Sequence, residues 1–291
     1  MLSLTKILLP IDFSDRCVGA IRRDLPILSN HFNTEITLLH VIPTSSMGVA
    51  EMAIALSADA IAKIKQDTAA RLDNFAREEL DNKRVRRVLL EGDPARTIVE
   101  FAHSQKSDLI MIPTHGYGPF RRLLLGSVTS KVLHDANCPV WTSAHLENHP
   151  SPEEPILLKH ILCAVDLGEH SEATLSWANQ LSAEYGSKLS LVHVVAALDP
   201  RTEAYYFAPE WRNFVIHETI KDMAKLKQTL SVQAEVRIEL GDIAKSVSLV
   251  AEQSKADLLV IGRGAVMGAL GRFRTHASAI IRQSPCPVVS V

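Results

Sequence analysis

The chain has 291 residues, which at about 150 residues per domain predicts two domains, and its 46% hydrophobic content excludes a disordered chain. Its 31 Lys and Arg residues nearly balance 33 Asp and Glu residues, and the formal net charge of −2 argues against a dedicated nucleic-acid or membrane-surface binder. Four widely spaced cysteines form no CxxC pair and no zinc-binding spacing, and no apolar run approaches the roughly 20 residues of a membrane span. No basic stretch precedes the first apolar run, so we expect no secretory signal and a cytoplasmic protein.

Strands and helices are predicted to alternate through the first half of the chain. Apolar runs at residues 6–12 and 35–41 indicate buried strands. The helix between them is expected to be capped by Ser14 or Asp15, to run toward Asn33, and to be kinked or interrupted by Pro26. Asp93 is expected to cap a later helix that has Pro94 in its first turn. The other predicted elements are an amphipathic helix, a polar edge strand, a buried strand, a short helix and a last strand, at residues 52–80, 84–90, 108–113, 128–135 and 138–141.

The second half of the chain repeats the first, because landmarks recur in one order with nearly constant spacing. The spacing is 154 residues for Asp12 and Asp166, 149 for Gly92 and Gly241, and 148 for Cys138 and Cys286. Prolines and glutamates between the copies predict a stiff, solvated linker. We therefore expect a first domain at residues 1–146, a linker at 147–157 and a second domain at 158–291.

The repeated order of elements predicts the fold class. Strands in the second copy are expected at residues 160–165, 188–194, 234–240, 257–262 and 286–291, again separated by helices. Strands that alternate with helices and are too apolar to face water favour parallel α/β sheets, joined by right-handed crossovers. The chain is thus predicted to form two tandem doubly wound five-stranded parallel sheets, with the first strand of each central, as in flavodoxin-like order.

A ligand site is expected at the carboxyl ends of the strands, where strand order reverses. In the first copy this edge carries Pro10, Ile11 and Asp12 after one strand, Val41 at the end of another, and the segment that starts at Pro113. That segment contains glycines that permit close backbone approach, and then a predicted helix start where free amides favour an anion. The residues concerned are Gly116, Gly118, Gly126, Ser127, Val128 and Thr129. Taken alone, such a loop is equally well a simple turn.

The spacing within this loop resembles the universal stress protein family, whose ATP-binding members carry G-x-x-G, nine residues, and then G-[ST]. Gly116 is followed by nine residues and then by Gly126 and Ser127, which matches. The first glycine of that pattern is replaced by Pro113, which lacks an amide hydrogen and adds a ring. The resemblance covers both copies and implies the fold of the adenine-nucleotide alpha-hydrolases.

The resemblance also implies roles for residues of the first domain. Asp12 and the backbone of Val41 would hold adenine, and Pro10, Ile11 and Pro113 would line the adenosine pocket. The phosphates of ATP would lie against the loop, with Mg or Mn bridging them and no metal ligand from protein side chains; ADP and AMP stay open as alternatives. The phosphate-binding residues implied are Gly116, Gly126, Ser127, Val128 and Thr129, whereas His115 either touches a phosphate or is a plain loop residue.

The second copy departs from the pattern, which predicts a degenerate site. Gly262 and Gly264 remain, but the Gly-Ser position holds either Arg274 and Thr275 or Thr275 and His276, depending on where a one-residue gap falls. An arginine there would fill the phosphate pocket or bind an anion itself. Since Asp166 and Val194 persist at the strand ends, adenosine binding without the phosphate loop stays open.

No residue pattern indicates a catalytic centre. His40 and His193 recur at a strand end, where a structural role is favoured over a metal pair or a general base, and Cys138 and Cys286 are expected to be buried thiols. The leading hypothesis is a nucleotide-binding regulator of the stress response, and the alternatives are slow ATP hydrolysis and an interaction scaffold. The resemblance implies that the last strands, near Val140 and Val288, pair within the chain as a pseudo-dimer; a homodimer of two chains also stays open.

Overall fold

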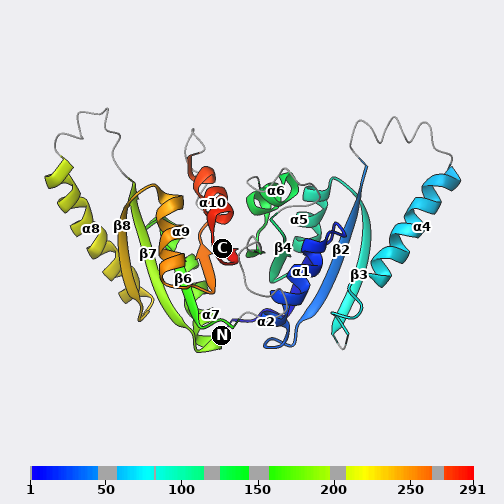
Figure 1. The fold of residues 1–291 in the computed structure, drawn as a ribbon, viewed down its shortest axis with the longest axis horizontal. Helices are drawn as coiled ribbons and strands as arrows, with labels where there is room; N and C mark the ends of the chain where they lie inside the picture. The colour runs from blue at the N-terminus through cyan, green and yellow to red at the C-terminus, as the bar shows by residue number, and fades with distance from the viewer. Residues whose placement is uncertain are drawn as a thin grey trace. The chain divides into compact units, whose positions relative to one another are not determined.

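The computed structural model describes residues 2–44, 58–81, 83–114, 125–143, 157–196, 208–263 and 272–291, without the side chains of residues 58, 208–211 and 272–275. The chain divides into two compact units, residues 3–156 and residues 157–291. Each unit contains a five-stranded parallel sheet with helices between the strands, as the repeat predicts (Figure 1). No described helix is both long enough and apolar enough to cross a membrane.

In the amino-terminal unit the strand order is β3-β2-β1-β4-β5, so the first strand is central as predicted. The chain steps outward from β1 to β3 and then returns to β4, and right-handed crossovers therefore place helices on both faces of the sheet. The strands are β1 Lys6–Pro10, β2 Glu35–Pro43, β3 Arg84–Gly92, β4 Leu109–Ile112 and β5 Val140–Thr142. The described helices are α1 Asp15–Arg23, α2 Leu25–Ser29, α4 Ala58–Asn74, α5 Pro94–Gln105 and α6 Ser127–Asp135.

The central strands form the core because their side chains are buried on both faces. Leu8 of β1 pairs with Thr37 of β2 on one side and with Ile110 of β4 on the other. All four residues of β4 are buried, whereas every residue of β3 is exposed or half-buried. The edge position predicted for the polar third strand is thus confirmed, since β3 is the terminal strand of the sheet among the described residues.

The structure confirms one helix boundary that the sequence predicted in this unit and corrects another. The break predicted at Pro26 is present, because α1 ends at Arg23 and α2 starts at Leu25. The helix predicted over residues 52–80 was too long: α4 ends at Asn74, and the ring of Phe75 turns back to contact Phe13, with ring centroids 5.5 Å apart. Residues 52–57 of that prediction lie outside the described part of the chain.

The carboxyl-terminal unit repeats the architecture with strand order β10-β9-β6-β7-β8. Its strands are β6 His160–Ala164, β7 Lys188–Ala196, β8 Glu235–Gly241, β9 Leu258–Ile261 and β10 Val288–Ser290. Its described helices are α7 Ser171–Tyr185, α8 Ala208–Thr229, α9 Ile243–Gln253 and α10 Arg272–Gln283. Unlike α1 and α2, α7 is continuous, since it has no proline within its range.

The repeated Gly-Asp pair joins a strand to a helix in both units. Gly92 and Gly241 have φ values of +149° and +142°, a region that residues with a side chain rarely adopt. The aspartate that follows caps the next helix: Asp93 accepts a hydrogen bond from the Arg96 amide, and Asp242 accepts one from the Lys245 amide, both at 2.9 Å. The cap predicted at Asp93 is therefore confirmed.

Candidate functional site

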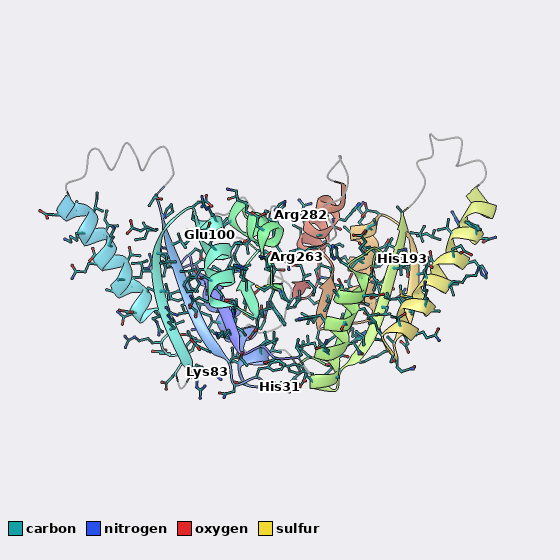
Figure 2. All side chains as sticks on the ribbon, turned by 180° about the vertical axis from the view of Figure 1, so that it is seen from behind. His31, Lys83, Glu100, His193, Arg263 and Arg282 are labelled. Atoms are coloured by element: carbon teal, nitrogen blue, oxygen red, sulfur yellow. The ribbon has the colours of Figure 1, made fainter. Side chains whose placement is uncertain are left out.

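The predicted site residues of the amino-terminal unit gather at the carboxyl edge of its sheet. β1 is hydrogen-bonded to both β2 and β4, so Asp12 after β1 and Pro113 after β4 emerge beside one another. Val41 lies near the end of β2 and is buried, as is Ile11. The opposite edge, where β2 and β3 begin, is marked by His31 and Lys83 in Figure 2. The strand order reverses between β1 and β4, which is where an open α/β sheet binds ligands.

Asp12 is held by a tight turn at the start of α1. Its Oδ1 accepts a hydrogen bond from the Ser14 amide at 2.9 Å and lies 3.0 Å from the Cys17 sulfur. Phe13 between them has φ +62°, a conformation that costs free energy for a residue with a side chain. Ser14 occupies the helix N-cap position but makes no side-chain capping bond. The turn thus fixes the aspartate rather than capping the helix.

His40 braces this turn from β2. Its Nδ1 lies 2.6 Å from the Ile11 carbonyl oxygen, which can only accept, so Nδ1 carries the hydrogen and Nε2 is the acceptor in the neutral ring. The Phe13 ring packs on the His40 ring at 4.5 Å between centroids, and the Arg71 guanidinium lies over the Phe13 ring, 4.3 Å from its centroid. These contacts give His40 a structural role. Among the described residues no group of three His, Cys, Asp or Glu side chains could hold a metal ion.

The start of α6 supplies the anion-binding part of the candidate site. The Gly126 amide donates to the Thr114 carbonyl at 2.9 Å, and the Thr129 hydroxyl donates to the Pro113 carbonyl at 3.0 Å. These two groups tie the helix to the end of β4. The amides of Ser127, Val128 and Thr129 donate to no described acceptor, as is usual in a first helical turn. The predicted phosphate-loop residues His115, Gly116 and Gly118 lie outside the described residues.

The carboxyl-terminal unit reproduces the turn with different side chains. Asp166 Oδ1 accepts hydrogen bonds from the Gly168 amide at 2.9 Å and from the Ser171 hydroxyl at 2.8 Å, and Leu167 between them has φ +60°. His193 Nδ1 donates to the Val165 carbonyl at 2.8 Å, as His40 does to Ile11. The structural role expected for both histidines thus rests on the same hydrogen bond in each unit.

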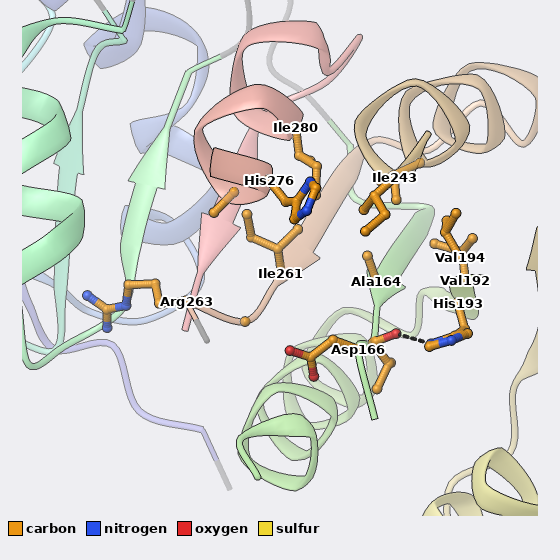
Figure 3. Close-up of a pocket in the computed structure, with 14 residues that line it drawn as sticks. Ala164, Asp166, Val192, His193, Val194, Ile243, Ile261, Arg263, His276 and Ile280 are labelled. Atoms are coloured by element: carbon orange, nitrogen blue, oxygen red, sulfur yellow. Dashed lines mark hydrogen bonds between the residues drawn. The ribbon is translucent and has the colours of Figure 1, made fainter. Parts of the chain in front are cut away.

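A cavity of about 210 Å³ opens at this edge of the carboxyl-terminal unit (Figure 3). Its walls are mainly apolar and come from the ends of β6, β7 and β9, from the first half of α9 and from the middle of α10. Polar groups enter from Asp166, His193 and His276, whereas the guanidinium of Arg263 points away from Asp166 in Figure 3. The apolar residues that line the cavity include Ala164, Val194, Ile243, Ile261, Ala277 and Ile280.

The structure also locates the one-residue gap in the second loop. β4 and β9 correspond at a spacing of 149, since they begin at Leu109 and Leu258. The helices that follow correspond at 148, because they end at Asp135 and Gln283 and bury the pairs Val132–Leu133 and Ile280–Ile281. The gap therefore precedes α10, which aligns Arg274 with Gly126 and Thr275 with Ser127. The side chains of Arg274 and Thr275, and all of Gly264, lie outside what the structure describes.

Sequence reasoning missed the residues that hold the two aspartates. Cys17 and Ser171 each contact the carboxylate that precedes them by five positions, and both side chains are hydrogen-bond donors. The signal was present in the repeat, because the spacing of 154 that aligns the two aspartates also aligns Cys17 with Ser171.

Together, the fold and the repeated strand-end turns define a duplicated doubly wound α/β protein with one candidate ligand site in each unit. The model of the universal stress protein family matches residues 3–143 and 158–291. The chain therefore belongs to the universal stress protein family, as two tandem copies.

Individual relatives agree with this assignment. The universal stress protein MJ0531 of Methanocaldococcus jannaschii is 34% identical over 137 residues, which is 46% of this chain and 79% of that protein. The universal stress protein MJ0577 of the same organism is 28% identical over 149 residues, or 46% of this chain and 91% of that protein. The crystal structure of a universal stress protein from Archaeoglobus fulgidus matches 99% of this chain and 96% of its own, with a TM-score of 0.71 and 22% identity, which supports the fold.

Proposed function

We propose that this chain is an adenine-nucleotide-binding regulator of the stress response that binds ATP in its amino-terminal unit. The observation that carries the proposal is the first turn of α6, whose amides at Ser127, Val128 and Thr129 have no described acceptor and lie after β4, at the same sheet edge as Asp12. Free amides and the helix dipole favour an anion. Family membership supports the same role, because the spacing from Gly116 to Gly126 matches that of ATP-binding members.

In this proposal the adenine end of ATP contacts Asp12 and the backbone of Val41, and Pro10, Ile11 and Pro113 line the adenosine pocket. The phosphate end meets the α6 amides and the loop residues His115, Gly116 and Gly118. A Mg or Mn ion bound with ATP would be held by phosphate oxygens and would offset their charge. ADP or AMP would use the same base contacts with fewer phosphate contacts.

The carboxyl-terminal unit is proposed to have lost the triphosphate site while keeping the adenosine end. Arg274 aligns with Gly126 but lies inside α10, which begins at Arg272, so the glycine that directly precedes a helix start in the amino-terminal unit is not repeated. Asp166, Val194 and Gly262 still line the cavity. Adenosine fits this mainly apolar cavity better than ATP, because no described lysine or arginine side chain points at its interior (Figure 3).

Titration of the full-length protein with ATP tests the proposal, alongside mass spectrometry of nucleotide that co-purifies with it. We expect one ATP per chain, and we expect Gly126→Trp to abolish binding, because an indole at that position covers the α6 amides. Ala277→Trp, which fills the cavity of the other unit, is the matched control and should leave ATP binding intact. A folded wild-type protein that binds no ATP at millimolar concentration would refute the proposal.

The cytoplasmic location stays a prediction of the sequence, and the pairing of the last strands near Val140 and Val288 stays a prediction of the family resemblance. Separate fractionation and cross-linking measurements would test them.

A further inference from the structure

The two candidate sites hold their aspartates with the same pair of donors but different chemistry. In each unit a backbone amide and a side chain from the first turn of the following helix meet at one carboxylate oxygen, Oδ1. The side chain is the Cys17 thiol in the amino-terminal unit and the Ser171 hydroxyl in the carboxyl-terminal unit. Both copies keep a donor at this position although the residue type differs, which indicates that the orientation of the carboxylate matters, whichever donor supplies it.

The Cys17 thiol has a single hydrogen, and its surroundings direct that hydrogen to Asp12. The sulfur lies 3.0 Å from Asp12 Oδ1 but 3.9 Å from the Pro10 carbonyl, and the Ser14 hydroxyl donates to the sulfur at 3.7 Å. Burial, together with the negative charge of Asp12, raises the pKa of Cys17 to about 12, so the thiol stays protonated at neutral pH. A protonated thiol is a donor, and the contact is attractive rather than a repulsion between two anions.

The other carboxylate oxygen, Oδ2, accepts no hydrogen bond from a described residue in Asp12 or in Asp166. An ionised carboxylate can only accept, so its free oxygen favours a ligand group that donates. An exocyclic amino group on a purine donates, whereas the oxo group that replaces it in hypoxanthine accepts. The turn therefore presents one acceptor of fixed direction to the base.

We infer that Cys17 is a positioning residue that orients Asp12 so that Oδ2 selects nucleotides whose base carries an exocyclic amino group. This inference rests on the proposed function, since it concerns the base end of the same site. It assigns specificity to the turn between β1 and α1 rather than to the phosphate loop. Ser171 is assigned the same role for Asp166.

The experiment compares ATP with ITP, which carries hypoxanthine in place of adenine, by titration of the full-length protein. Wild type should favour ATP by about tenfold, the order expected when one charge-assisted hydrogen bond is lost. Cys17→Ser should keep that ratio because the hydroxyl of Ser171 makes the equivalent bond, whereas Cys17→Ala should weaken ATP binding and bring the ratio close to one. Cys163→Ala, which removes a buried thiol with no described partner, is the matched control and should change neither affinity.

Asp12→Asn gives a sharper test of orientation. Because the Ser14 amide and the Cys17 thiol both donate to the Oδ1 position, the asparagine oxygen should take that place and its NH2 group should face the ligand. The preference should then invert in favour of ITP, and adding Cys17→Ala should weaken the inversion. Thermal unfolding of each variant shows whether it is folded.

The outcomes separate the two proposals. If wild type binds neither nucleotide, the proposed function fails and this inference fails with it. If wild type binds ATP but Cys17→Ala lowers ATP and ITP affinity equally, Cys17 is a structural residue and only the inference is overturned. An unchanged preference in Asp12→Asn overturns it as well.

Discussion

The residue that follows the fourth strand of each unit illustrates how a single contact decides which side chain is tolerated. A Cβ built on Gly262 would lie 2.9 Å from the Thr174 hydroxyl oxygen, closer than such atoms approach. Thr174 is buried on α7, and its hydroxyl also contacts the His170 carbonyl at 3.0 Å. The equivalent residues of the amino-terminal unit are Pro113 and Ala20, so the oxygen that limits Gly262 has no counterpart on α1. The departure of Pro113 from the family pattern thus has a local explanation.

Gly262→Ala should lower the free energy of unfolding of the carboxyl-terminal unit by about 1–3 kcal/mol, the usual effect of overpacking a core. Thr174→Ala in the same chain should recover most of that loss by removing the opposing oxygen. Urea unfolding of the two single variants and the double variant gives the coupling directly. Losses that simply add would show that the Thr174 contact is not the limiting one.

At the scale of the element, each Gly-Asp turn should stabilise the helix that it starts. Asp93→Ala should cost about 1 kcal/mol of unfolding free energy, because the Arg96 amide loses its acceptor, and Asp242→Ala should cost about the same. Asp93→Asn keeps an acceptor oxygen and is the control that separates capping from charge. Lys131 lies 3.8 Å from Asp93 and both are exposed, so we expect little from that ion pair. Equal losses from Ala and Asn, measured by urea unfolding, would assign the effect to charge instead.

Elements with a strong local signal were predictable from the sequence, and those decided by tertiary contacts were not. The apolar run of β1, the break at Pro26 and the cap at Asp93 all act through neighbouring residues. The end of α4 was missed because Phe75 leaves the helical pattern to pack on Phe13, a contact between distant segments. The bond from Cys17 to Asp12 was missed for a related reason. A cysteine at a helix position is ordinarily taken for a buried core residue, and its contact with Asp12 depends on the conformation of the preceding turn, which the sequence does not show.

At the scale of the whole molecule, duplication has preserved one end of the candidate site and changed the other. The turn after the first strand keeps the same hydrogen bonds in both units. A backbone amide donates to the aspartate Oδ1, and a histidine Nδ1 donates to the carbonyl of the residue before the aspartate. The segment that would meet phosphates differs: Gly126 directly precedes α6, whereas its counterpart Arg274 lies inside α10, which begins at Arg272. The two units should therefore agree in their response to the base and disagree in their response to the phosphates.

Hydrogen exchange of the full chain with ATP and with adenosine tests this division. ATP at a hundred times its dissociation constant should slow exchange roughly a hundredfold in the amino-terminal unit, at the turn from Asp12 to Cys17 and at the α6 amides. The turn from Asp166 to Ser171 should be unaffected by ATP, because the second unit lacks the Gly-Ser pair of the proposed phosphate site, whereas adenosine should protect both turns. Gly126→Trp should remove the ATP effect and keep the effect of adenosine on the carboxyl-terminal turn. Equal protection of both turns by ATP would mean that the second loop still accepts a triphosphate, since only phosphate contacts distinguish the two ligands.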